Sequence, residues 1–156
     1  SNKEIANACD KLQSQITSGT CSITQRAGIA AYEGGLETVH EMREVFQRRR
    51  NLVYDLLKDI PGIKVNLPAG AFYFFPDVSS FYGKTTEEGE VIKDGEELAL
   101  YLLNQGHVAV VSGDAFGDPK SIRISYAAAD DKLVEAISRI KNALSKLKDA
   151  KAVPAV

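Results

Sequence analysis

The stretch VAVVSGDAFGDPKSIRISYAAADD, residues 108–131, holds two predicted strands, the loop between them and the start of a helix. Residues 108–111 are a continuous apolar run, which predicts a buried strand. Residues 122–126 alternate between apolar and polar side chains, which is typical of a half-buried strand. Because Asp130 and Asp131 then open a helix with a regular apolar stripe, the stretch indicates a sheet against which a helix packs.

The other elements are predicted upstream of this stretch. Apolar periodicity, strand composition and breaker residues place helices over residues 3–16, 22–33, 36–59 and 95–106, and strands over residues 63–66 and 71–75. The predicted order is three helices, two strands, a helix, two strands and a final helix. This order is typical of an α+β fold, with a small mixed or antiparallel sheet covered by helices.

Side chains in three segments lead to more specific expectations. Ser22 and Gln25 fit a capping box in which Ser22 is the N-cap. The Arg48-Arg49-Arg50 run is interpreted as a solvated face, and residues 79–94 are predicted to be a surface loop. The helix over residues 36–59 carries a predicted buried stripe of Val39, Met42, Phe46, Val53, Leu56 and Leu57.

Composition argues against several classes of function. The 156 residues fit one domain, and a net charge of -2 gives no field that would favour nucleic acid or an anionic membrane as partner. No apolar run reaches the ~20 residues of a membrane span. The two cysteines, Cys9 and Cys21, are expected to be thiols in a reducing cytosol. Because no Cys/His cluster occurs, we expect no metal site.

Arg123 is the candidate binding residue, because a guanidinium on a strand is a rigid fork that fits a carboxylate. Asp114 and Asp118 in the preceding loop offer a structural ion pair instead, which the residue types alone favour because exposed arginines are common. The aromatic strand over residues 72–75 either lines a ligand site or fills the core. Tyr126 either hydrogen-bonds a ligand or is simply half-buried.

Five segments, taken in order, resemble one enzyme family. They are Ser14–Ser18, Gln25–Ala27, Arg48–Arg50, Pro68–Tyr73 and Ile122–Ala127. The series is similar to the C-terminal part of aspartate aminotransferases, fold-type I enzymes of class I/II that depend on pyridoxal 5'-phosphate. This resemblance covers residues 3–147. It implies that residues 1–150 are the small domain of such an enzyme, that residues 151–156 are a tail, and that the cofactor-binding large domain is absent.

The resemblance also implies roles for individual residues. Arg123 binds the α-carboxylate of the amino-acid substrate. Gly70 permits close backbone approach at the substrate entrance, and Phe72 packs beside the pocket. Thr17 and Ser18 approach the cofactor in the active site of the partner subunit of a homodimer. No residue of this chain is expected to be catalytic, because the Schiff-base lysine of the family lies upstream, and the chain alone is expected to be inactive.

The implied function is amino transfer between aspartate and 2-oxoglutarate by a cytoplasmic homodimer, with pyridoxal 5'-phosphate as cofactor and amino acids and 2-oxo acids as substrates. The missing initial methionine suggests a piece of a longer protein. The residues alone leave two alternatives open. One is a free-standing domain that binds a carboxylate ligand through Arg123. The other is an interaction domain whose contact face is the helix over residues 36–59.

Overall fold

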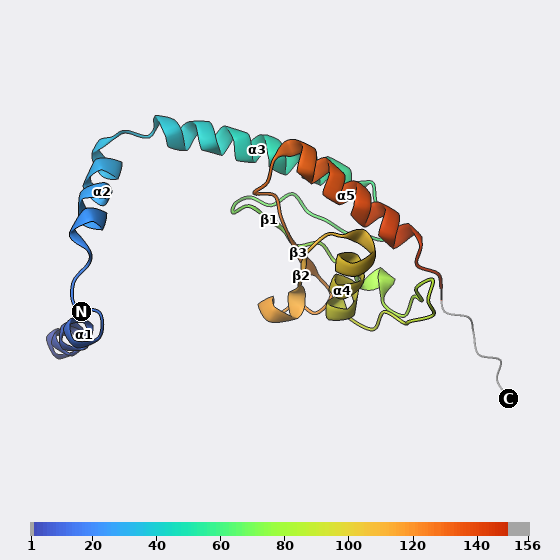
Figure 1. The fold of residues 1–156 in the computed structure, drawn as a ribbon, viewed down its shortest axis with the longest axis horizontal. Coiled ribbons are helices and arrows are strands. Elements are labelled where there is room, and N and C mark those ends of the chain that lie inside the picture. The colour runs from blue at the N-terminus through green and yellow to red at the C-terminus, as the bar shows by residue number, and fades with distance from the viewer. Residues whose placement is uncertain (1, 150–156) are drawn as a thin grey trace. The chain divides into compact units, whose positions relative to one another are not determined.

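The computed structural model describes residues 2–149 and confirms the α+β class, with helices and a small antiparallel sheet (Figure 1). The chain divides into two compact units, Ser1–Glu41 and Met42–Val156. The tail predicted over residues 151–156 lies outside the described residues.

The first unit holds two complete helices, both close to their predicted bounds. α1 covers Lys3–Ile16, and α2 covers Ser22–Glu33. Neither helix has a buried residue. The apolar stripe of α1 is exposed within the chain, and Ile16 for example is 76% exposed. Backbone hydrogen bonds, rather than an apolar core, therefore hold these helices together.

The start of α2 differs from the predicted capping box. Cys21 is the N-cap, and Ser22 is already the first helical residue. Gln25 donates from Nε2 to the Thr20 carbonyl oxygen at 2.7 Å. The capping-box prediction is wrong because the helix begins one residue earlier than its sequence pattern indicates.

α3 covers Glu37–Lys58, close to the prediction. Val53 and Leu57 in its C-terminal half are buried in the core of the second unit. Val39 and Met42 in its N-terminal half are 56% and 55% exposed. The predicted buried stripe is therefore confirmed for Val53 and Leu57 and wrong for Val39 and Met42. Phe46 and Leu56 are partly buried against the core.

The arginine run of α3 is not simply a solvated face. Arg48 and Arg49 donate from Nε to the two carboxylate oxygens of Asp130, at 3.2 and 3.0 Å. These hydrogen bonds, first from Arg49 and then from Arg48, lower the pKa of the Asp130 carboxyl. Asp130 is the first residue of α5, Asp130–Ser145. The contact ties the middle of α3 to the start of the last helix.

The sheet belongs to the second unit and has three short strands. β1 covers Tyr73–Phe74, β2 covers Val111–Ser112 and β3 covers Ile122–Ser125. The spatial order is β1-β3-β2, and both pairings are antiparallel. β3 is therefore the central strand. The strand predicted over residues 63–66 is reduced to a single bridge between Lys64 and Asp77.

The apolar run over residues 108–111 does not form the buried strand that we predicted. Val108 and Val110 are only partly buried against the core, and Val111 is 40% exposed. The physical reason is the position of β2 at the edge of the sheet. An edge strand has a neighbour on one side only, so an apolar run there does not require burial on both faces.

A single apolar core joins the sheet to the helices of the second unit. α4, which covers Gly95–Gly106, contacts both α5 and β2. Phe74, Ile122 and Ile124 point from the sheet into this core. The most deeply buried helical side chains are Val53, Leu57, Leu98, Leu102 and Ile140.

Residues 79–94 were predicted to be a surface loop, but they are partly built into the fold. A short 3-10 helix, η1, covers Ser79–Phe81, and Phe81 is buried. Ile92 is 3% exposed, and Thr85 bridges to both Val91 and Lys148. The prediction followed the polar composition of the segment and missed the two apolar side chains, Phe81 and Ile92, that are buried in the core.

Candidate functional site

One face of the sheet points away from the apolar core. Because directly opposite residues of an antiparallel pair lie on the same side, the register places Tyr73, Val111, Arg123 and Ser125 on one face. All four side chains are half-buried or exposed. We call this surface the open face.

The guanidinium of Arg123 lies over two aromatic rings on the open face. Its central carbon is 4.6 Å from the ring centroid of Tyr73 and 4.3 Å from that of Phe116. Tyr73 belongs to β1, and Phe116 ends the 3-10 helix η2, Gly113–Phe116, which follows β2. One ring therefore comes from β1, which pairs with β3, and the other comes from the loop that joins β2 to β3. Each such contact stabilises by about 0.5–1 kcal/mol where it is exposed.

The structural ion pair of Arg123 with a loop aspartate is not formed. The arginines that form ion pairs within residues 2–149 are Arg48, Arg49 and Arg139. Asp114 accepts a hydrogen bond from the Ser112 hydroxyl at 2.7 Å, and Asp118 accepts one from the Ser121 hydroxyl at 2.6 Å. The two loop carboxylates therefore form hydrogen bonds within their own loop.

Backbone constraints hold Phe116 where it meets Arg123. A side chain at Gly113 would collide with the carbonyl oxygens of Asp118 and Ser121, so only glycine fits there. The Gly113 N–H donates to the Ser121 carbonyl at 2.8 Å. Gly117, directly after Phe116, has a φ of 82°, in the left-handed region that favours glycine. The loop therefore folds back tightly around its two glycines.

The aromatic residues of the predicted strand over residues 72–75 take both roles that the sequence allowed, because some fill the core and others lie on the open face. Phe74 is 1% exposed and fills the core. Tyr73 and Phe75 are half-buried, and Phe75 meets the Phe116 ring edge-on with centroids 6.2 Å apart. Alternation along the strand accounts for the division, because successive side chains point to opposite faces. The sequence reasoning singled out Arg123 but did not identify Tyr73 and Phe116 as its partners.

Phe72 and Gly70 precede β1. The Phe72 ring is 40% exposed, with its centroid 4.4 Å from that of Tyr73 and 6.0 Å from that of Phe46. The Phe72 ring therefore lies beside the Tyr73 ring, which in turn contacts the Arg123 guanidinium. Gly70 is exposed, and a Cβ there would meet no atom of the described chain within 4 Å. The expected roles of both residues at a substrate stay predictions.

Tyr126 has a structural role within the chain. It is 2% exposed, and its hydroxyl donates to the Ala71 carbonyl at 2.8 Å. Ala71 has a φ of 59°, an uncommon conformation for a residue with a side chain. Because the hydroxyl proton is used in this bond, Tyr126 stabilises the turn that carries Gly70 rather than presenting that proton to a ligand.

A cavity of about 370 Å³ lies beside this turn. Arg43, Gln47 and Arg50 of α3 line it together with Gly70 and Tyr126. Arg50 donates from Nη1 to the Pro68 carbonyl at 3.2 Å, which fixes its guanidinium against the turn.

Thr17 and Ser18 lie in the first unit, at the end of α1. Thr17 is its C-cap, and the Thr17 hydroxyl is hydrogen-bonded to the Gln13 side chain. Ser18 has a φ of 58°, and both residues are exposed. Their expected contact with a cofactor stays a prediction.

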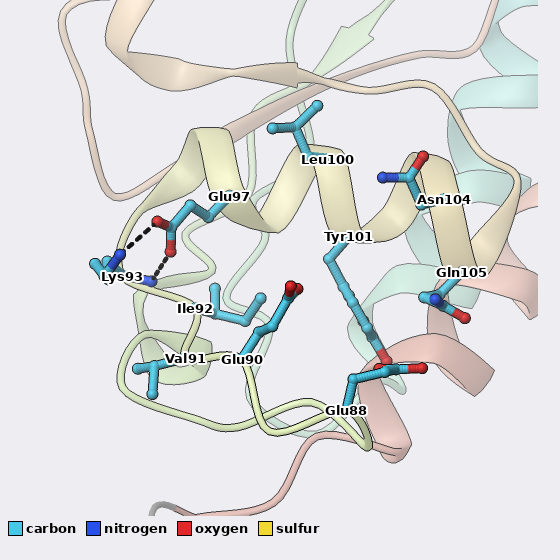
Figure 2. A pocket seen from close by; sticks show the side chains of 10 residues that line it. All are labelled: Glu88, Glu90, Val91, Ile92, Lys93, Glu97, Leu100, Tyr101, Asn104 and Gln105. Carbon is cyan, nitrogen blue, oxygen red and sulfur yellow. Dashed lines mark hydrogen bonds and ion pairs between the residues drawn. The ribbon is translucent and has the colours of Figure 1, made fainter.

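A cavity of about 610 Å³ lies between residues 88–93 and α4 (Figure 2). In Figure 2, Glu88 and Glu90 reach toward Tyr101 from the loop below the helix. Lys93 donates to Glu97 from both its backbone N–H, at 2.8 Å, and its Nζ, at 2.9 Å.

This cavity does not fit pyridoxal phosphate. A lysine that reacts with the aldehyde of the coenzyme must lose its proton, whereas the hydrogen bond to Glu97 raises the pKa of Lys93. Glu88 and Glu90 would also repel a phosphate.

Other classes of site receive no support within residues 2–149. No group of three or more histidine, cysteine or acidic side chains is arranged to hold a metal ion there. Cys9 and Cys21 are free and exposed. None of the helices in this part of the chain combines the length and apolar character needed to cross a membrane.

The chain is similar to aminotransferases over nearly its whole length. The family model described as aminotransferase class I and II matches residues 1–140. The aspartate aminotransferase of Pinus pinaster is 44% identical over 153 residues, which are 96% of this chain and 31% of that protein. A Petunia hybrida protein, a bifunctional aspartate aminotransferase and glutamate/aspartate-prephenate aminotransferase, is 46% identical over 94% of this chain and 31% of its own length.

Solved structures agree with this similarity. The crystal structure of the aspartate aminotransferase from Rhizobium meliloti matches with a TM-score of 0.88 and 42% identity, over 93% of this chain and 36% of that one. The chain therefore spans about a third of the length of the relatives that it matches.

Proposed function

Because the chain belongs to the class I and II aminotransferase family, we propose that it supplies the part of a pyridoxal-phosphate-dependent aminotransferase that binds the substrate carboxylate. The observation that carries this proposal is Arg123, a half-buried guanidinium held over two aromatic rings. Family membership favours this function over a free-standing ligand-binding or interaction domain.

The chemistry of the substrates explains why one arginine serves both halves of the reaction. An amino acid donates its amino group, and a 2-oxo acid accepts it. Both molecules carry a carboxylate next to the reacting carbon. A guanidinium presents two parallel N–H groups that fit the two oxygens of a carboxylate. By holding that end, Arg123 orients the neighbouring carbon of either substrate.

The coenzyme belongs, in this proposal, to the whole protein. Pyridoxal phosphate serves as an electron sink when bound, and the protein supplies its binding and orientation. The chain spans about a third of the length of its relatives, so we assign it substrate binding and assign coenzyme attachment to the rest of the protein. Thr17 and Ser18 are proposed to approach the coenzyme of the partner subunit in a cytoplasmic homodimer. Aspartate and 2-oxoglutarate are the proposed substrates, by similarity to the relatives.

Arg123→Lys in the full-length protein tests the proposal. Lysine keeps the positive charge but loses the fork. A hydrogen bond to a charged group contributes about 1.5–3 kcal/mol, so kcat/KM for aspartate should fall roughly 10- to 100-fold, with a higher KM. Steady-state kinetics measure this.

Arg139→Lys is the matched control, because Arg139 is a half-exposed arginine of α5 that pairs with Glu135. Its kinetics should match those of the unmodified protein. If Arg123→Lys also left kcat and KM unchanged, Arg123 would have no part in substrate binding.

A further inference from the structure

We propose that Phe116 and Tyr73 are positioning residues that hold the Arg123 guanidinium ready for a carboxylate. This inference rests on the proposed function and adds to it the residues that set the affinity for substrate. Neither ring is expected to touch the reacting atoms. Both act through Arg123.

Aromatic rings hold a cation without using its hydrogen-bond donors. A carboxylate partner would occupy the N–H groups of Arg123, and a substrate would then have to displace it. The ring faces of Tyr73 and Phe116 attract the positive charge through their π electrons instead. Since the nearby Asp114 and Asp118 carboxylates are bonded within their own loop, the fork of Arg123 is left for an incoming carboxylate.

The two rings come from separate parts of the fold, which makes the support rigid. Tyr73 is fixed by the β1–β3 pairing, in which it lies opposite Ser125. Phe116 is fixed by the tight loop around Gly113 and Gly117 and by its edge-on contact with Phe75. A long side chain that is already held loses less rotamer freedom when it binds a ligand. The substrate therefore binds more tightly than it would to a freely rotating arginine.

Phe116→Leu in the full-length protein tests the inference, because leucine keeps the apolar bulk and removes the ring. Losing one pre-ordered side chain should raise KM for the amino acid and for the 2-oxo acid by roughly 3- to 10-fold. The value of kcat should change by less than about twofold, because the lost binding is shared by ground and transition states. Phe116→Tyr keeps a ring and should restore most of the lost affinity.

Two further variants complete the set. Tyr73→Leu removes the other ring and should raise KM in the same way, which keeps the test decisive if Phe116→Leu folds poorly. Leu103→Ala is the matched control, since Leu103 is 47% exposed on α4. Its KM should be unchanged.

A spectroscopic measurement separates positioning from general damage. Ring currents from Tyr73 and Phe116 should shift the side-chain proton resonances of Arg123 in arginine-labelled protein. The shift should shrink in Phe116→Leu and persist in Leu103→Ala. The inference is overturned if Arg123→Lys weakens binding while both ring variants keep the original KM. If Arg123→Lys has no effect, the proposed function itself is wrong.

Discussion

Tyr82 stabilises the segment that carries Phe116. Its hydroxyl donates to the Pro119 carbonyl at 2.8 Å, across 37 residues of sequence. Burial, followed by the nearby Asp114 charge, raises the pKa of Tyr82 to about 12. The neutral hydroxyl is therefore the form that the folded state favours.

We expect Tyr82→Phe to lose about 0.5–1.5 kcal/mol of unfolding free energy at neutral pH, because the Pro119 carbonyl loses its partner. A folded pKa above the ordinary value of 10 means that this stabilisation is complete below pH 10 and is lost as the pH rises toward 12. Urea unfolding across this range measures it. Tyr32→Phe, whose ring is 94% exposed, is the control. Equal stability of Tyr82→Phe and the unmodified chain would contradict the prediction.

At the scale of elements, the start of α4 has a side-chain cap. Asp94 has an extended backbone, and its carboxylate accepts from the N–H groups of Glu96 at 3.0 Å and Glu97 at 2.9 Å. These N–H groups have no partner inside the helix, so the cap satisfies donors that would otherwise need water.

We expect Asp94→Ala to cost about 1 kcal/mol of unfolding free energy, whereas Asp94→Asn should retain most of the stability because an amide oxygen also accepts. Chemical denaturation of the three proteins measures the difference. If alanine and asparagine were equivalent at this position, the cap would contribute nothing.

At the scale of the whole molecule, the two units differ in what holds them together. The helices of the first unit bury no residue, while α5 buries Leu133, Ile137, Ile140, Ala143 and Leu144. Isolated helices shorter than about 12–15 residues are marginal in water, because starting a helix is costly. Of the described helices, tertiary packing therefore stabilises those of the second unit and not α1 or α2.

Amide hydrogen exchange of the 156-residue chain should show this difference. We expect the backbone amides of α1 and α2 to exchange orders of magnitude faster than the central amides of α5, which open only when the core opens. Mass spectrometry or NMR resolves the two sets. Similar protection in α1 and α5 would show that the first unit is stabilised by more than its own helices.

The sequence by itself determined the helices of this protein. Helical periodicity predicted α1 and α3 to within about one residue, and Asp130 and Asp131 marked the start of α5. These features depend on neighbours a few positions apart, and residue order specifies such neighbours directly. The five motifs in order between residues 14 and 127 also pointed to the family that the comparisons support.

Only the tertiary structure decided which distant groups meet. The ends of the Arg48–Asp130 contact are 82 residues apart, and Arg123 meets Tyr73 of β1 and Phe116 of the 3-10 helix η2. The same packing left β2 at the sheet edge, where its apolar run stays partly exposed. Periodicity states which face a side chain takes but not what lies opposite it. The opposing group is set by strand order and loop path, which depend on how the whole core closes.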